Sequence, residues 1–443
     1  MNKKFTVFSL FIVTALFALQ AEPTMMTLHD CMEYAVSNST KIHIQEAEIG
    51  DRRLEIRDAI LSTFTPSVGA STSGYYSFGR NIDPQTNTYF NQTSFHNNYS
   101  VSASIDLFDG LASINNIKIS KTGLMISQSK EQQLEADICL AVMETYYSVV
   151  YYKRLTEVYA SQIATAEKSL SMAKLQEELG TKGYADIVEM EAELASIEYD
   201  HTNTRNQYLQ YLLELEALIF WHEDQKLEID YSLPMWLPET FDEDVIIDYA
   251  TGNNPEIKIA EGNILNSKRE YQTSKLQLLP SLSLYGGWST SYYTISGYQS
   301  ERFRNQFANN AGEYIQLSLS LPIYDGLKNI SRIKKKKNAV IVAKNEYDQK
   351  VMDISNEIRR AVQDYEGSSI AYSQGLKKSR VQEEAYRLNI KKLEQGLISP
   401  LEFQTANNNY LKAKADEMNS LFQCIIKQAI VKYYSGIDYI NQL

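Results

Sequence analysis

The chain has 443 residues, a formal net charge of -12 at pH 7 and only 3 cysteines. An acidic balance of this size disfavours nucleic acid as a partner. The three cysteines show no metal spacing and allow at most one disulfide, which excludes a disulfide-rich or zinc-stabilised class. The length would suit several ordinary domains, but a duplicated unit of about half the chain favours one repeated architecture.

The N-terminus has the three regions of a secretory signal. Lys3 and Lys4 precede an apolar run, and small residues follow it up to Ala21. We therefore expect residues 1–21 to be a signal peptide. The run is shorter than the roughly 20 apolar residues that a membrane helix needs, and no later stretch is as apolar. Cys31 lies well beyond this run, so no lipid anchor is expected.

The first repeat is predicted to occupy residues 22–232. A helix is expected over 28–64, with a break near 38–40, followed by a strand over about 67–76. A polar loop then leads to a strand over about 99–108, which Asp109-Gly110 ends. Long helices are expected over 110–179 and 184–221, because proline is absent and Gly180 separates them.

The second repeat, residues 233–443, has the same order of signals. Asp325-Gly326 follows an alternating segment as Asp109-Gly110 does, and Pro280 corresponds to Pro66. Strands are expected over about 281–292 and 314–324, and long helices over 327–395 and 400–434. The predicted class is mainly α with a small β part, built by internal duplication.

The strands alternate apolar and polar residues. Val101, Ala103 and Ile105 share one face, while Ser100, Ser102 and Ser104 share the other. Aromatic residues gather at strand ends, as they do at membrane interfaces, and each segment is about as long as a tilted membrane strand. The alternative is a soluble antiparallel sheet with one buried face. In lipid, four strands with open edges would leave backbone groups unpaired, so the sequence predicts that protomers assemble to close the barrel.

The long helices predict coiled-coil hairpins that surround a tube. A helix of about 70 residues spans about 105 Å, which no globular core requires. Residues at 3,4 spacing, such as Ile187, Met190, Leu194 and Ile197, form seams in which His201 is a packing residue. No nucleophile elbow, phosphate loop or metal motif is found, so neither an enzyme nor a cofactor site is expected.

The helix-to-helix turns carry candidate functional residues. In the second copy Gly396 ends one helix, Ser399 is an N-cap and Glu402 follows at the third helical position. In the first copy Gly180, Gly183 and Asp186 take these positions. Asp186 and Glu402 are expected to cap helices. They could also combine with Glu189, in an oligomer, into an acidic ring at a constriction that holds cations.

With these units and turns, the chain resembles the outer membrane factor family, the TolC-like channel-tunnels of efflux and type I secretion. The resemblance covers residues of about 25 to 436 and implies a homotrimer with a twelve-stranded barrel and a periplasmic α-barrel. It also implies a periplasmic adaptor protein and an inner-membrane transporter as partners. Asp186, Glu189 and Glu402 would face the constriction, although the second copy has Thr405 where the first has Glu189. The adaptor would contact the hairpin tips at Gly180, Thr181, Gly183, Gly396, Leu397 and Ser399.

The sequence therefore predicts an outer membrane channel-tunnel for passive export from a periplasmic adaptor and pump to the exterior. The alternative is a soluble periplasmic coiled-coil scaffold. Fractionation distinguishes the two, because the channel would be found in outer-membrane pellets and the scaffold in the osmotic-shock supernatant.

Overall fold

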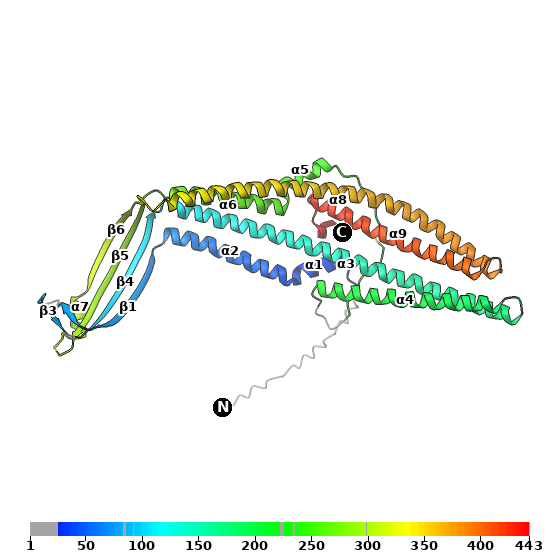
Figure 1. Ribbon diagram of the computed structural model, residues 1–443, viewed down its shortest axis with the longest axis horizontal. Helices are drawn as coiled ribbons and strands as arrows, with labels where there is room; N and C mark the ends of the chain where they lie inside the picture. Colours follow the sequence, from blue (N-terminus) through cyan, green and yellow to red (C-terminus); the bar gives the residue numbers. More distant parts are fainter. Residues whose placement is uncertain are drawn as a thin grey trace, which may run out of the picture.

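The computed structural model describes residues 25–82, 86–91, 93–221, 226–233, 235–297 and 299–442. The predicted signal peptide, residues 1–21, lies outside these ranges. The chain is elongated, with a small sheet at one end, two helical hairpin tips at the other and shorter elements midway (Figure 1). This layout places the two predicted functional regions, strands and tips, at opposite ends of the molecule.

The two halves contain the same succession of elements, with small insertions. The first half consists of α1 (Leu28–Asn38), α2 (Thr40–Phe64), β1 (Ser67–Ser77), β2 (Arg80–Ile82), β3 (Tyr89–Asn91), β4 (Ser94–Phe108), α3 (Ala112–Glu178) and α4 (Tyr184–Leu218). The second consists of α5 (Glu243–Asn253), α6 (Pro255–Leu276), β5 (Ser281–Ile295), α7 (Phe303–Asn309), β6 (Gly312–Ser320), α8 (Lys328–Glu394), α9 (Pro400–Tyr434) and the 3-10 helix η1 (Tyr439–Gln442). The predicted class, mainly helical with a small sheet and an internal duplication, is confirmed.

Local capping explains where the first helices of each half begin. Thr27 and Asp30 form a capping box at the start of α1. The break between α5 and α6 falls at Asn254, whose side chain accepts hydrogen bonds from two backbone N–H groups, and Pro255 occupies the first turn of α6. The corresponding break in the first half falls at Ser39, within the predicted interval.

The four main strands form one antiparallel sheet in the order β1-β4-β5-β6. Its register aligns the apolar positions across strands, since Ile105 pairs with Leu284 and Leu284 with Leu317. The opposite face carries serine, and the Ser71 and Ser100 hydroxyls lie 2.8 Å apart across β1 and β4. The sheet therefore has one apolar face and one polar face, as the alternation predicted.

Several strand limits differ from the prediction. β4 begins at Ser94 rather than 99, because residues 94–98 pair with both β1 and β5. β6 ends at Ser320, since Pro322 lacks the N–H needed to continue a ladder. The register shifts between Asp106 and Phe108, so Leu107 has no partner on β5 and the apolar row that Val101, Ala103 and Ile105 form is interrupted there. The β2–β3 pair and α7 were not predicted.

The same device joins strand to helix in both halves. The Asp109 carboxylate accepts from the Ser113 backbone N–H at 2.7 Å, and Asp325 accepts from that of Asn329 at 2.7 Å. Gly110 has a φ of +70° and Gly326 one of +68°. Glycine adopts this left-handed conformation without a steric penalty. The Asp-Gly pairs therefore turn the chain and cap α3 and α8.

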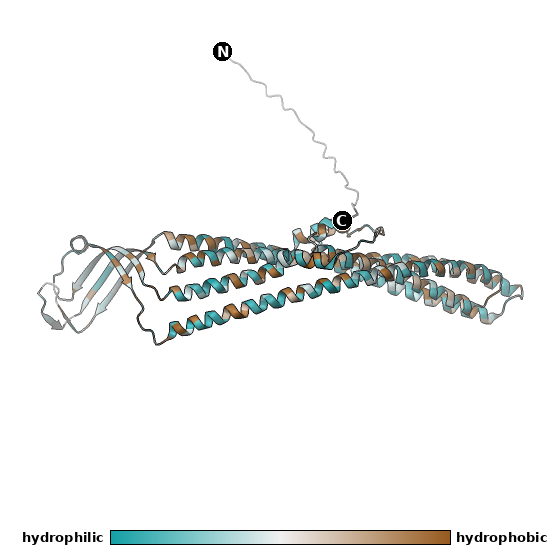
Figure 2. Cartoon of the chain, turned by 90° about the horizontal axis from the view of Figure 1, so that it is seen from above, coloured by the Kyte–Doolittle hydropathy of each residue, from teal (hydrophilic) through white to brown (hydrophobic). Residues whose placement is uncertain are grey.

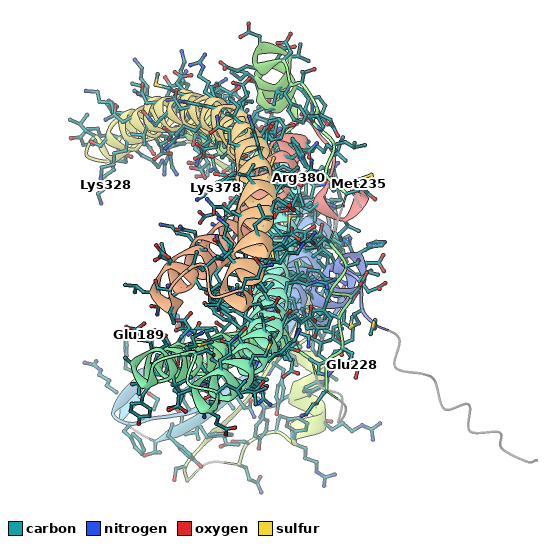
Figure 3. The ribbon with its side chains drawn as sticks, turned by 90° about the vertical axis from the view of Figure 1, so that its right-hand side faces the viewer. Glu189, Glu228, Met235, Lys328, Lys378 and Arg380 are labelled. Carbon is teal, nitrogen blue, oxygen red and sulfur yellow. The ribbon has the colours of Figure 1, made fainter. Side chains whose placement is uncertain are left out.

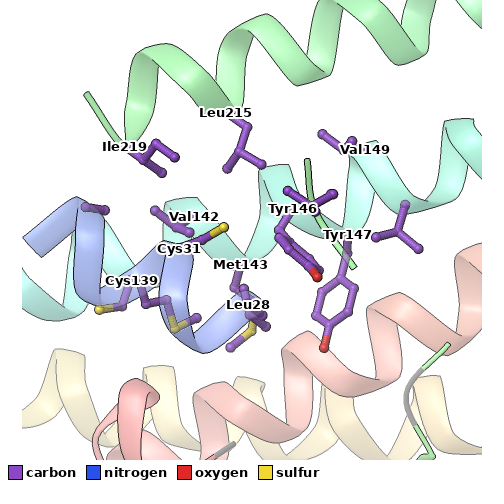
Figure 4. Packing of buried hydrophobic residues seen from close by; sticks show 14 of the residues in the cluster. Leu28, Cys31, Cys139, Val142, Met143, Tyr146, Tyr147, Val149, Leu215 and Ile219 are labelled. Carbon is purple, nitrogen blue, oxygen red and sulfur yellow. The ribbon is translucent and has the colours of Figure 1, made fainter. Parts of the chain in front are cut away.

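The main core lies midway along the molecule, where the elements of both halves meet. Cys31, Val142, Met143, Leu215 and Ile219 are almost completely buried there, on α1, α3, α4 and the residue after α4 (Figure 4). A second cluster joins α5, α8 and α9. All three cysteines are buried and free, so the single disulfide that the sequence allowed is not formed.

The predicted coiled-coil seam of α4 is confirmed, because Ile187, Met190, Ile197 and Leu215 are buried. Hydrophilic and apolar residues are intermixed along the long helices, without a continuous apolar stretch (Figure 2). Among the residues that the structure describes, no helix combines the length and apolarity needed to cross a membrane.

Candidate functional site

The two long hairpins turn through the same backbone motif. In the first, the N–H groups of Gly180 and Thr181 donate to the carbonyls of Glu177 and Gln176 at 2.8 and 2.9 Å. In the second, Gly396 and Leu397 bond in the same pattern to Leu393 and Lys392. This is the Schellman arrangement, which requires a left-handed residue after the helix, and both glycines have positive φ.

The return helices begin differently in the two copies. Ser399 and Glu402 form the predicted capping box, with the Ser399 N–H donating to the Glu402 carboxylate at 3.1 Å. Gly183 is the N-cap of α4 but has no side chain that could accept a hydrogen bond. Asp186 lies in the first turn of α4, where a carboxylate stabilises the helix dipole. The tip of the second hairpin is therefore capped more fully.

Two of the candidate constriction carboxylates, Glu189 and Glu402, are exposed, while that of Asp186 is half-buried. In the view along the long axis, Glu189 projects from the surface of its hairpin (Figure 3). Asp186 and Glu402 immediately precede Ile187 and Phe403, which belong to one apolar cluster. A single protomer therefore places both carboxylates beside the same cluster without any hydrogen bond between them among its described residues.

That cluster holds the two hairpins together near their tips. It combines Leu170 of α3, Ile187 of α4, Leu393 of α8 and Phe403 of α9. Tyr386 of α8 stacks on Phe403, with ring centroids 5.8 Å apart, and burial raises the pKa of its hydroxyl. The tips of the two repeats are thus packed against each other by aromatic and aliphatic side chains.

One polar contact near the tips was not predicted. Asn407 Nδ2 of α9 donates to Glu193 Oε1 of α4 at 3.2 Å, and the two residues are 1% and 8% exposed. A buried carboxylate is costly unless it is hydrogen-bonded. Glu193 follows Met190 and precedes Ile197 on the seam of α4, and this position was the only signal in the sequence. The contact links the two repeats directly.

Among the described parts of the chain, no group of His, Cys, Asp and Glu could hold a metal ion. The tips have exposed turns, in which Leu179 and Leu397 are 71% and 68% exposed. The long helical hairpins with exposed turns at one end, and the sheet with one apolar and one polar face at the other, are the features of a class of membrane proteins in which a β-sheet carries a long helical tunnel.

The comparisons with known proteins agree with this class. The family described as "Outer membrane efflux protein" matches residues 35–219 and 246–430, once in each half. The chain belongs to this family. It is therefore an outer membrane efflux protein with a long periplasmic extension, and it is a transport channel rather than an enzyme.

Solved structures share the fold at low sequence identity. A membrane protein from Pseudomonas aeruginosa is 15% identical, with a TM-score of 0.78 over 94% of this chain and 91% of that one. The Campylobacter jejuni CmeC outer membrane channel is 16% identical, with a TM-score of 0.76 over 100% and 94% of the two chains. The Neisseria gonorrhoeae MtrE outer membrane channel, crystallised in its open state, is 17% identical, with a TM-score of 0.73 over 94% and 88%. The comparison with curated protein sequences found no match.

Proposed function

We propose that three copies of this chain form a passive duct through the outer membrane, supplied from the periplasm by an adaptor and an inner-membrane transporter. The sheet supports the trimer. β1 and β6 are its unpaired edges, and an open edge in lipid costs several kcal/mol for each unsatisfied backbone group. Three sheets of four strands would form a closed barrel of twelve.

The exposed apolar face of the sheet supports its contact with lipid. Val68, Ile315, Leu317 and Leu319 are all exposed in the protomer, and Ile315 is 86% exposed. Their pairing partners on the neighbouring strands lie on the same face. A soluble scaffold would bury such a face, so this is the single observation that favours the duct most.

The hairpin tips are proposed to be the docking site for the adaptor. Gly180, Thr181 and Gly183 form one turn, and Gly396, Leu397 and Ser399 form the other. Both turns are the parts of the helices farthest from the sheet (Figure 1). An adaptor of an efflux system or of a type I secretion system could dock there, and the proposal does not distinguish the two.

The constriction is proposed to lie at the same end. Trimerisation would bring together three copies of Asp186, Glu189 and Glu402, all in the first two turns of the return helices. A ring of carboxylates favours cations in a narrow pore. Because Thr405 replaces a second acid in the other repeat, the ring would be asymmetric.

Single-channel recording of the purified protein in planar bilayers tests the duct and its ring. The duct should give stable ion conductance, and Asp186→Asn with Glu402→Gln should lower its preference for cations. Asp51→Asn with Asp348→Asn is the matched control, because these carboxylates are exposed and lie far from the tips. Unchanged selectivity in the first variant would remove the ring. The absence of conductance from every preparation would contradict the duct.

Crosslinking in cells tests the adaptor site. A cysteine at Thr181 or Ile398 should crosslink a periplasmic protein, whereas one at the exposed Leu213, far along α4, should not. The native cysteines are buried and should contribute no background. Equal crosslinking from all three positions would contradict docking at the tips.

A further inference from the structure

The helices carry an unusual concentration of positive charge next to the sheet. The last ten residues of α2 and α6 and the first ten of α3 and α8 form the sheet-side end of the helical bundle. This end contains 12 basic and 3 acidic residues, in a chain whose net charge is -12. The basic residues are Arg57, Lys118, Lys121, Lys268, Arg269, Lys275, Lys328, Arg332, Lys334, Lys335, Lys336 and Lys337. The acidic ones are Glu55, Asp58 and Glu270.

The opposite end of the same bundle has the reverse balance. Windows of equal length at the tips, residues 169–178, 184–193, 385–394 and 400–409, contain 4 basic and 8 acidic residues. The charge is therefore sorted along the axis and does not simply reflect a composition rich in lysine. A solvated helix surface does not need such sorting.

Most of the positive charge at the sheet side is available to a partner. Ten of the 12 basic residues are exposed, and Arg269 and Lys336 are half-buried. Among the described residues, the only ion pairs of this group join Lys336 to Glu270 at 2.5 Å and Arg57 to Asp58 at 3.3 Å. Asp109 and Asp325, at the strand-to-helix joints, are engaged in capping.

An apolar collar lies between these cations and the strands. Phe64, Leu111, Ile323, Tyr324 and Leu327 are exposed at the joints, and Ile323 is 89% exposed. Along the joints from β4 into α3 and from β6 into α8, the order from the sheet outward is therefore an apolar strand face, an exposed apolar collar, and then cations. This is the order of acyl chains, interface and charged headgroups at one surface of a bilayer.

From this order we propose that the sheet-side cations, which we call the basic belt, bind the anionic phospholipid headgroups of the periplasmic leaflet of the outer membrane. The proposal rests on the membrane orientation given under the proposed function. The groups that would be bound are phosphate-bearing lipids with a net negative charge, such as phosphatidylglycerol, in preference to zwitterionic phosphatidylethanolamine.

The geometry of α8 shows why its lysine run suits such a surface. Successive residues of a helix are about 100° apart around its axis. Lys336 pairs with Glu270 of the neighbouring α6, so its side chain points along the layer that α6 and α8 form. Lys335 and Lys337 therefore project from the two opposite faces of this layer. Whichever face is on the outside of the assembly, one of these two lysines points outward, toward the headgroups.

The test uses the mature full-length protein, after its trimeric state in outer-membrane pellets has been established. Native mass spectrometry then measures the binding of phosphatidylglycerol and phosphatidylethanolamine to the purified trimer. Each cation near an anionic surface strengthens binding about fivefold, so we expect the wild type to prefer phosphatidylglycerol about tenfold or more. The triple variant K334Q/K335Q/K337Q should lose most of this preference.

The matched control is K377Q/K391Q/K392Q, which removes the same charge from exposed positions on the same helix, far from the sheet. It should retain the wild-type preference. Should the first triple variant fail to assemble, Lys-to-Arg replacements at these positions should restore both assembly and preference. In addition, increasing salt should weaken the preference of the wild type itself.

Equal binding of the two lipids by the wild type, or an unchanged preference in K334Q/K335Q/K337Q, would overturn the basic belt as a lipid site. If this variant instead keeps its lipid preference and changes anion conductance in planar bilayers, the lysines face the lumen and the proposal is wrong. A wild type that forms no membrane-inserted trimer would overturn the proposed function first, and this result is recognised before lipid binding is measured.

Discussion

Gly110 provides a sharp test of how the two halves of the chain are joined. A Cβ atom at Gly110 would lie 2.4 Å from the carbonyl oxygen of Leu276, at the end of α6. At Gly326, the equivalent joint in the second half, a Cβ would meet nothing within 4 Å. Both glycines have positive φ. Alanine at either position is therefore strained, but only Gly110→Ala also collides with backbone.

The two variants should differ by an amount that the structure determines. Left-handed backbone costs alanine about 1–2 kcal/mol, which both variants share. Overpacking against a backbone oxygen adds about 1–3 kcal/mol at Gly110 alone. We therefore expect Gly110→Ala to lower the free energy of unfolding by about 2–5 kcal/mol and Gly326→Ala by about 1–2 kcal/mol.

Urea unfolding of the detergent-solubilised protein, followed by far-UV circular dichroism, measures the difference. Gly69→Ala serves as a control, because Gly69 has ordinary φ and open space around its Cβ position. The urea concentration at the midpoint of unfolding should be highest for Gly69→Ala, lower for Gly326→Ala and lowest for Gly110→Ala. Equal midpoints for the last two variants would refute the close approach of the first joint to α6.

Three further predictions concern the tips and the core. Gly396→Ala should destabilise its turn by about 1–2 kcal/mol, because the φ of Gly396 is +71°. Gly183→Ala should not destabilise the other turn, because the φ of Gly183 is -84°. Limited proteolysis at the tips should be faster in the first variant, and equal rates in the two variants would contradict this. Asn407→Ala should cost about 1–3 kcal/mol, because the buried Glu193 carboxylate loses a donor, and unchanged hydrogen exchange in α9 would count against it. Burial raises the pKa of Cys31 to about 12, so at about pH 8 maleimide should label it only after unfolding; rapid labelling of the native protein would disprove this.

The helical part of the fold was predictable because its signals are local. Gly180 and Gly396 end long segments without proline, and Ser399 with Glu402 forms a capping box that can be recognised within four residues. Each signal occurs twice, so the two halves support each other. The observed α3 and α8 begin and end within two residues of the predicted limits.

The limits of the strands depend on partners that are distant in the chain. Residues 94–98 look like a polar loop, yet they extend β4 because β1 and β5 offer pairing on both sides. The Glu193–Asn407 contact was missed for the same reason, since a glutamate on a helix is usually a surface residue until a second repeat covers it. The duplication showed that two hairpins exist but not which side chains meet between them.

The central claim is that one protomer supplies only part of a barrel, and that other protomers must pair with the edges of its sheet when the sheet lies in lipid. The most direct measurement is the mass of the mature protein extracted from outer-membrane pellets with a mild detergent. We predict a stable assembly of three protomers that precipitates when the detergent is removed. A monodisperse monomer, recovered without detergent from the periplasmic fraction, would contradict it.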